Sequence, residues 1–120
     1  MTARAAFVVA AAATVAAATA SAAPAATPTV NGTVGPGFTI GLTQAGKKVT
    51  ALHAGKVTFV VNDKASIHNF EVSGPKGFSK KLTDVGFVGK KAVTLTLSPG
   101  TYTFYCKPHK SSMNGTFKVS

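Results

Sequence analysis

An alternation of apolar and polar residues runs from Thr29 to the C-terminus of this sequence and leaves few folds open to the chain. Glycine and proline interrupt this period-two pattern every few residues, and no sustained helical periodicity accompanies it. Seven segments are predicted to be strands: 38–43, 48–52, 56–62, 67–73, 91–97, 101–106 and 114–119. Seven to eight short strands at this spacing predict an all-β fold, an antiparallel Greek-key sandwich or barrel. Residues 78–89 fit neither template and are expected to form a long connection with at most a short strand at 85–88.

The N-terminus has the pattern of a secretory signal. A single positive charge, Arg4, precedes an uncharged Ala-rich run that ends in Ala20-Ser21-Ala22, the small-x-small pattern of a cleavage site. The run is too short and too weakly apolar to span a bilayer. We expect a signal peptide at 1–22, a flexible lead-in at 23–30 and one domain at 31–120. The protein is then periplasmic or secreted, without stable membrane insertion.

The charge of the chain is strongly basic. Thirteen Lys and Arg stand against three Asp and Glu, which gives a net charge of +10. Such a surface attracts acidic partners and speeds their encounter. Nucleic acid is not favoured as a partner, because every basic residue except Arg4 is a lysine and export removes most nucleic-acid targets.

The single cysteine lies in a segment rich in metal-binding residue types. An unpaired Cys in an exported protein indicates intermolecular pairing, a reactive thiol or a ligand. Cys106 ends a predicted strand, His109 follows three residues later, and the next strand begins after Met113. So short a loop brings a thiolate, an imidazole and a thioether toward one point.

With a second imidazole, these groups make the His₂Cys set with a distant axial Met that is typical of a blue-copper site. Zinc also accepts Cys and His, but a thioether is a poor zinc ligand, so Met113 favours copper. The remaining ligand is His53 or His68. His68 shares the parity of Phe70 and Val72 near one end of a predicted strand, whereas His53 lies at a turn. We therefore favour His68 as the ligand and expect His53 to be a surface histidine.

From about residue 34 to its end the chain resembles the cupredoxins of the plastocyanin and azurin family. The resemblance rests on His-Asn-Phe at 68–70, Pro-Gly-Thr-Tyr at 99–102 and Tyr-Cys-x-Pro-His-x-x-x-Met-x-Gly-x-Phe at 105–117. It implies one Cu(I)/Cu(II) ion per chain, with three equatorial ligands and one weak axial ligand: His68, Cys106 and His109, and Met113. It also implies that Asn69 ties the strand of the first ligand to the Cys loop and hydrogen-bonds near the thiolate. The Cys-x-x-His spacing is like plastocyanin and amicyanin, and the His-x-x-x-Met spacing is like azurin.

Three functions are compatible with this site. The favoured one is a one-electron carrier in which His109 presents its ring edge to solvent. A copper chaperone or storage protein using the same ligands is the alternative. A nucleophilic Cys/His enzyme is disfavoured, because no Asp or Asn is placed to orient the histidine and Pro108 stiffens the loop. We expect a monomer that is not an enzyme.

The surroundings of His109 favour a particular kind of partner. Lys107 and Lys110 flank it, which differs from the apolar mouth of many cupredoxins and predicts an acidic redox protein as the partner.

Overall fold

The computed structural model describes residues 2, 5–6, 9–14 and 26–120. Most of the predicted signal peptide (1–22) and the first three residues of the lead-in (23–30) fall outside the described residues. Within the described part of the chain, no helix has the length and apolar character needed to cross a membrane.

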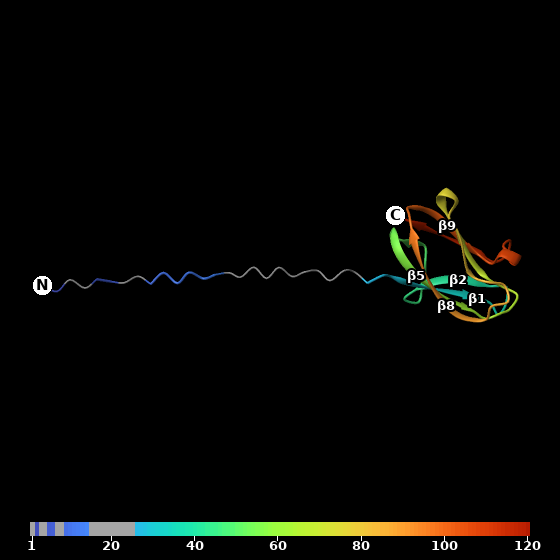
Figure 1. The fold of residues 1–120 in the computed structure, drawn as a ribbon, viewed down its shortest axis with the longest axis horizontal. Coiled ribbons are helices and arrows are strands. Elements are labelled where there is room, and N and C mark those ends of the chain that lie inside the picture. The colour runs from blue at the N-terminus through green and yellow to red at the C-terminus, as the bar shows by residue number, and fades with distance from the viewer. Residues whose placement is uncertain (1, 3–4, 7–8, 15–25) are drawn as a thin grey trace.

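The folded region is a sandwich of two five-stranded sheets (Figure 1). The first sheet has the order β3 (Lys47–Lys48), β2 (Ile40–Gln44), β1 (Thr29–Val34), β5 (Gly55–Asp63), β8 (Gly89–Leu97). The second has the order β4 (Ala51–Leu52), β10 (Asn114–Val119), β9 (Gly100–Tyr105), β6 (Phe70–Ser73), β7 (Ser79–Thr83). Two 3-10 turns, η1 (Pro75–Gly77) and η2 (Lys107–His109), are the helical elements of the described residues. The all-β sandwich predicted from the sequence is confirmed.

The strand pairing differs from the prediction in two places. Most neighbouring strands are antiparallel, but β1 pairs with β5 in parallel and β10 pairs with β4 in parallel. The strand count is also higher than seven to eight. The segment predicted as one strand at 48–52 is divided between β3 and β4, which join different sheets.

Two strands were not identified individually from the sequence. β1 begins at Thr29 and buries Val30, so the first sheet starts two residues before the domain boundary expected at 31. β7 lies inside the connection expected at 78–89, and its first three residues are exposed, so it has no alternating pattern. The short strand considered at 85–88 is absent, and residues 85 and 86 form a turn instead.

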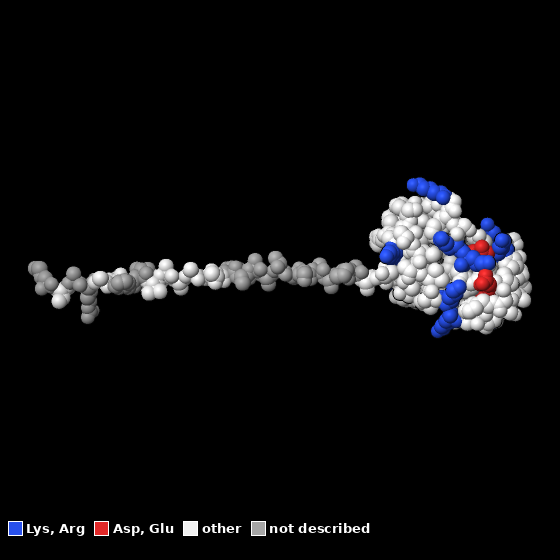
Figure 2. Space-filling model, in the orientation of Figure 1, with Lys and Arg blue, Asp and Glu red and all other residues white. Residues whose placement is uncertain are grey.

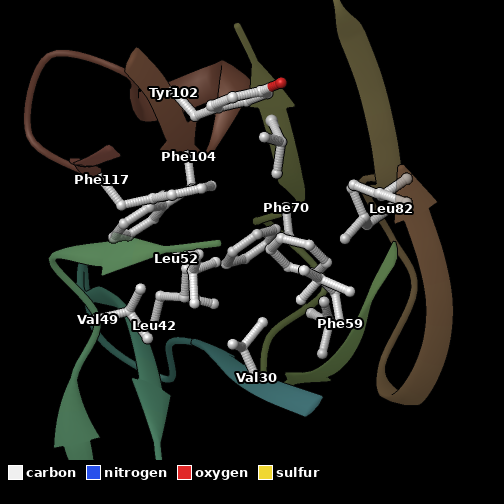
Figure 3. Close-up of a cluster of buried hydrophobic side chains, with 14 of the residues drawn as sticks. Val30, Leu42, Val49, Leu52, Phe59, Phe70, Leu82, Tyr102, Phe104 and Phe117 are labelled. Atoms are coloured by element: carbon white, nitrogen blue, oxygen red, sulfur yellow. The ribbon is translucent and has the colours of Figure 1, made fainter. Parts of the chain in front are cut away.

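Apolar side chains from both sheets fill the space between them (Figure 3). The ring of Phe70 stacks on that of Phe104, with centroids 5.8 Å apart, and Tyr102 stacks on Phe117 at 5.3 Å. Burying a side chain of this size contributes roughly 1.5–3 kcal/mol. Phe70 and Phe104 thus lock β6 to β9, the two strands whose ends lead to His68 and Cys106.

Four loops meet at one end of the sandwich, called here the loop end: 35–39, 64–69, 84–88 and 106–113. The strand register places them there. Val34 pairs with Asp63, and Asp63 pairs with Gly89, so the loops that follow β1 and β5 and precede β8 are neighbours. In the second sheet Tyr105 pairs with Asn114, which places the Cys loop at the same end of the sandwich. Figure 1 shows this loop, with η2, at the end of the sandwich opposite the start of β1.

Candidate metal centre

The loop between β9 and β10 holds Cys106 and Met113 side by side. η2 contains Pro108 and turns the chain directly after Cys106. The N–H of Cys106 donates to the carbonyl of Met113 at 3.1 Å, and the N–H of Met113 donates to the carbonyl of His109 at 2.9 Å. Both Cys106 and Met113 are fully buried. The backbone of the loop is therefore closed by its own hydrogen bonds.

His68 reaches the same place from the 64–69 loop. It is buried, and its Nδ1 lies 3.1 Å from Nδ1 of His109. The Sγ of Cys106 lies 3.7 Å from each of these nitrogens. Within the residues that the structure describes, this is the one cluster of three His, Cys, Asp or Glu side chains placed to hold a metal ion. It is the cluster that the sequence predicted.

The three donor atoms surround a position of the right size for a transition-metal ion. Their mutual distances put a point equidistant from all three at about 2.0 Å from each. Zinc, for comparison, binds imidazole at about 2.0–2.1 Å and thiolate at about 2.3 Å. Two imidazoles and a thiolate in one plane also form the donor set of a blue-copper centre. The residues present fit the metal that the sequence predicted.

A hydrogen bond fixes which nitrogen of His68 faces the centre. Its Nε2 lies 3.0 Å from the carbonyl oxygen of Gly37. A carbonyl can only accept, so Nε2 carries the proton and Nδ1 keeps its lone pair for a metal. Metal-binding histidines commonly donate their second N–H in this way, which fixes the tautomer and orients the ring.

Gly35 lets the 35–39 loop approach His68 this closely. Its φ is +71°, in the left-handed region that glycine tolerates. A Cβ at this position would lie 3.2 Å from Cδ2 of His68 and 3.2 Å from Cβ of Ala65. A larger residue would therefore be strained and would crowd the imidazole.

Asn69 links the two ligand-bearing loops. Its Oδ1 accepts the backbone N–H of Lys107 at 2.8 Å, and its Nδ2 donates to Oε2 of Glu71 at 3.0 Å. The first bond joins the residue after His68 to the residue after Cys106. The link between the His68 segment and the Cys loop that the resemblance implied for Asn69 is therefore present.

Asp63 anchors the other side of the His68 loop. This buried carboxylate accepts the N–H of Ala65 at 3.2 Å and the hydroxyl of Thr83 at 3.2 Å, and that hydroxyl accepts the N–H of Phe70 at 2.9 Å. Burial raises the pKa of Asp63 above 3.8, while the two hydrogen bonds and the nearby His68 partly oppose the rise. The loop is thus fixed on both sides of the ligand.

Phe38 was not recognised as a site residue from the sequence. Its ring meets His68 edge-on at a centroid distance of 5.4 Å and His109 at 4.9 Å. The side chain is 60% exposed, so it covers both imidazoles and also faces solvent. The signal in the sequence was Gly-Pro-Gly at 35–37, a turn directly before a predicted strand, but nothing local assigned that turn to the site.

His53 lies away from this centre. It is exposed, sits between β4 and the Gly55 end of β5, and lines a hollow with Leu52 and Ser120. The loop end is at the other end of β5, eight residues farther along a strand that rises about 3.3 Å per residue. The structure places His53 outside the cluster, as expected.

Lys107 and Lys110 are both exposed beside His109, which is half-buried. Lys110 does not simply point into water, because its Nζ lies over the ring of Tyr105, 4.4 Å from the centroid. Figure 2 shows basic side chains around the few acidic ones near the loop end of the domain.

Comparison with known proteins agrees with this geometry. Residues 39–120 match the family described as copper binding proteins, plastocyanin/azurin family. Rusticyanin from Thiobacillus ferrooxidans is 25% identical, with a TM-score of 0.50, and the match covers 77% of this chain and 76% of that one. A methionine-to-glutamine variant of rusticyanin matches with 23% identity, the same coverage and a TM-score of 0.52. A variant of amicyanin in its Cu(I) form is 15% identical with a TM-score of 0.50, over 77% of this chain and 82% of that one.

Proposed function

This chain belongs to the plastocyanin/azurin family of copper-binding proteins, and on that premise we propose that it is an exported one-electron carrier between redox partners. Its cofactor is one copper ion in a type 1 site. The family consists of small electron-carrier proteins and not of enzymes. The observation that carries the proposal is the convergence of two imidazole nitrogens and a thiol sulfur, 3.1–3.7 Å apart, on hydrogen-bonded loops.

The roles of the four ligands follow from their positions. His68, Cys106 and His109 would supply the three strong bonds, since their donor atoms already surround one point. Met113 would be the weak axial ligand, because it is buried at the end of the same loop and its backbone is bonded to Cys106 and His109.

A carrier needs a site that changes little between oxidation states. Bound copper supplies the Cu(II)/Cu(I) couple. The protein holds His68 through Gly37, Cys106 through the backbone of Met113, and the two loops together through Asn69. These bonds keep the donor atoms in place whichever charge the ion carries, which favours fast electron exchange.

The loop end has the character of a docking surface for a redox protein. Phe38, Ile67, Val85 and Val88 are the large apolar side chains that are exposed within residues 26–120, at 52–60% each. All four lie in loops of this end. Other loops therefore supply an apolar surface beside the lysines that flank His109.

Basic side chains accompany this apolar surface. Lys64 lies in the 64–69 loop and Lys107 and Lys110 lie in the 106–113 loop of the same end, and the chain as a whole carries +10. We propose that the partner presents acidic groups around an apolar contact, and that electrons enter and leave through the ring of His109. Steering by charge would make the encounter fast at low ionic strength.

Export completes the proposal, and the monomer expected from the sequence stays a prediction. The Ala-rich N-terminus with Ala20-Ser21-Ala22 supports secretion and cleavage after Ala22. The mass of the protein recovered from the periplasm or medium tests this, since the mature chain should begin at Ala23.

A copper chaperone or storage protein with the same ligands is the alternative, and repeated redox cycling separates the two. The copper-loaded protein is reduced and reoxidised many times in the presence of a Cu(I) chelator. A carrier keeps its copper and recovers its full colour after each cycle. Loss of the copper to the chelator at the first reduction would overturn the carrier and favour the chaperone.

A further inference from the structure

Two of the three acidic residues of this basic chain are buried, and both lie next to the segment that carries His68. The chain has only Asp63, Glu71 and Asp84 as acidic residues. Asp63 and Glu71 are buried, whereas Asp84 is exposed and pairs with Lys81 at 2.9 Å. Burying a carboxylate is costly unless hydrogen bonds compensate it. The question is what the Glu71 carboxylate does.

Glu71 is bonded to an amide and not to a lysine. It lies beside Lys81 in the β6–β7 register and beside Tyr105 in the β6–β9 register. Among the described residues, the one ion pair within 4 Å is that of Lys81 with Asp84. The carboxylate of Glu71 instead accepts a hydrogen bond from Nδ2 of Asn69. Burial raises the pKa of the neighbouring Tyr105, and Glu71 adds to that rise.

The orientation of the Asn69 amide depends on this bond. An asparagine amide can turn over and exchange its oxygen and nitrogen. Only one orientation presents Oδ1 to the N–H of Lys107, and in that orientation Nδ2 must face Glu71. A carboxylate accepts and never donates when ionised, so it selects this orientation, and the charge strengthens the bond.

We propose that Glu71 is a positioning residue for the copper site: through Asn69 it holds the backbone N–H of Lys107 and with it the position of Cys106. The connection runs from Glu71 Oε2 to Asn69 Nδ2, and from Asn69 Oδ1 to the N–H next to Cys106. This inference rests on the proposed copper site but concerns the protein before metal binds. The side chain of Glu71 hydrogen-bonds to Asn69 and to none of the proposed ligands.

Two variants of similar size separate the hydrogen bond from packing. Glu71→Gln retains an acceptor oxygen for Asn69, and Glu71→Met fills the same space without one. In the copper-free protein, hydrogen exchange of the Lys107 amide should remain slow in Glu71→Gln and become at least about tenfold faster in Glu71→Met. The amide of Lys118, which donates to the carbonyl of Thr50 at 3.0 Å, serves as the internal control for general loosening of the fold.

Copper affinity supplies a second readout. Outer partners of metal ligands typically change affinity by about 10–100-fold when removed. We expect a loss in this range for Glu71→Met and for Asn69→Ala, and a loss below about threefold for Glu71→Gln. If Glu71 acts through Asn69, the double variant Glu71→Met with Asn69→Ala should bind copper no more weakly than Asn69→Ala alone.

The outcomes distinguish this inference from the proposed function. Additive losses in the double variant, or an unchanged Lys107 amide in Glu71→Met, would overturn the role of Glu71 while leaving the copper site intact. A wild-type protein that gives no intense visible band with Cu(II) would overturn the proposed function, whatever the Lys107 amide does.

Discussion

The Nδ1 atoms of His68 and His109 lie 3.1 Å apart although 41 positions separate the two residues in the chain. The bond from Nε2 of His68 to the carbonyl of Gly37 indicates that the proton of this imidazole is on Nε2. If His109 is also neutral with its proton on Nε2, neither Nδ1 atom can donate a hydrogen bond to the other. Two lone pairs therefore face one position together with the sulfur of Cys106. A binding site arranged in this way before the ion arrives should bind it with little rearrangement, and the ligand predictions follow from that.

The first prediction concerns the ligand set. Cu(II) added to the metal-free protein should produce an intense visible band, because Cys106 supplies a short Cu–S bond. Cys106→Ser should abolish the band, and His68→Ala should weaken copper binding by at least about tenfold. His53→Ala is the matched control and should leave the spectrum unchanged, since His53 lies at the other end of β5. Absorption titrations measure this, and loss of colour in the His53 variant alone would contradict the assignment.

The second prediction concerns Met113. As a weak axial ligand it should tune the reduction potential rather than create the site. Met113→Leu keeps the buried volume and removes the sulfur donor, so the variant should remain coloured. Its reduction potential should be higher, because loss of the sulfur donor destabilises Cu(II) more than Cu(I). Voltammetry measures the shift. A variant that binds no copper would instead make Met113 a principal ligand.

The ligands could be predicted because their chemistry is local in the sequence. Cys106, His109 and Met113 occupy one short loop between two alternating strands, and a loop of that length must bring them close. His68 required only the parity of Phe70 and Val72. The sheet pattern similarly predicted the sandwich, because side chains on one face must be apolar when two sheets pack.

The contacts that orient the ligands could not be predicted in this way. The carbonyl of Gly37 and the ring of Phe38 reach the site from a loop about 30 positions before His68. A backbone carbonyl has no sequence signature, and an exposed phenylalanine has many ordinary explanations. The parallel pairing of β1 with β5 is a long-range choice of register. β7 begins with three consecutive exposed residues, Ser79, Lys80 and Lys81, where an alternating pattern would be expected.

The third prediction concerns the lysines at the loop end. Replacing Lys107 and Lys110 together by Glu should lower the potential, because positive charge near the site favours the reduced ion. It should also slow reaction with an acidic partner at low salt, by about tenfold or more. The control is Lys47→Glu with Lys48→Glu, the same change of charge on β3. Stopped-flow rates against ionic strength measure this, and equal slopes for the two double variants would exclude steering by the loop end.

The last prediction concerns the pH dependence of stability through Asp63. Burial raises its pKa above the ordinary value of 3.8 in the folded protein. A carboxyl whose pKa is raised by folding stabilises the fold most below its unfolded pKa, and that contribution is lost as the pH rises through the folded pKa. The free energy of unfolding of the wild type, relative to Asp63→Asn, should therefore fall between pH 3.8 and the raised pKa, then stay constant.

Asp84→Asn is the control, for which the stability difference should change with pH in the opposite direction. Lys81 lowers the pKa of Asp84, so the wild type should gain stability over that variant as the pH rises toward 3.8. Urea unfolding of the copper-free proteins between pH 3 and 7 measures both differences. A difference for Asp63 that grows with pH would mean that its bonds to Ala65 and Thr83 outweigh its burial.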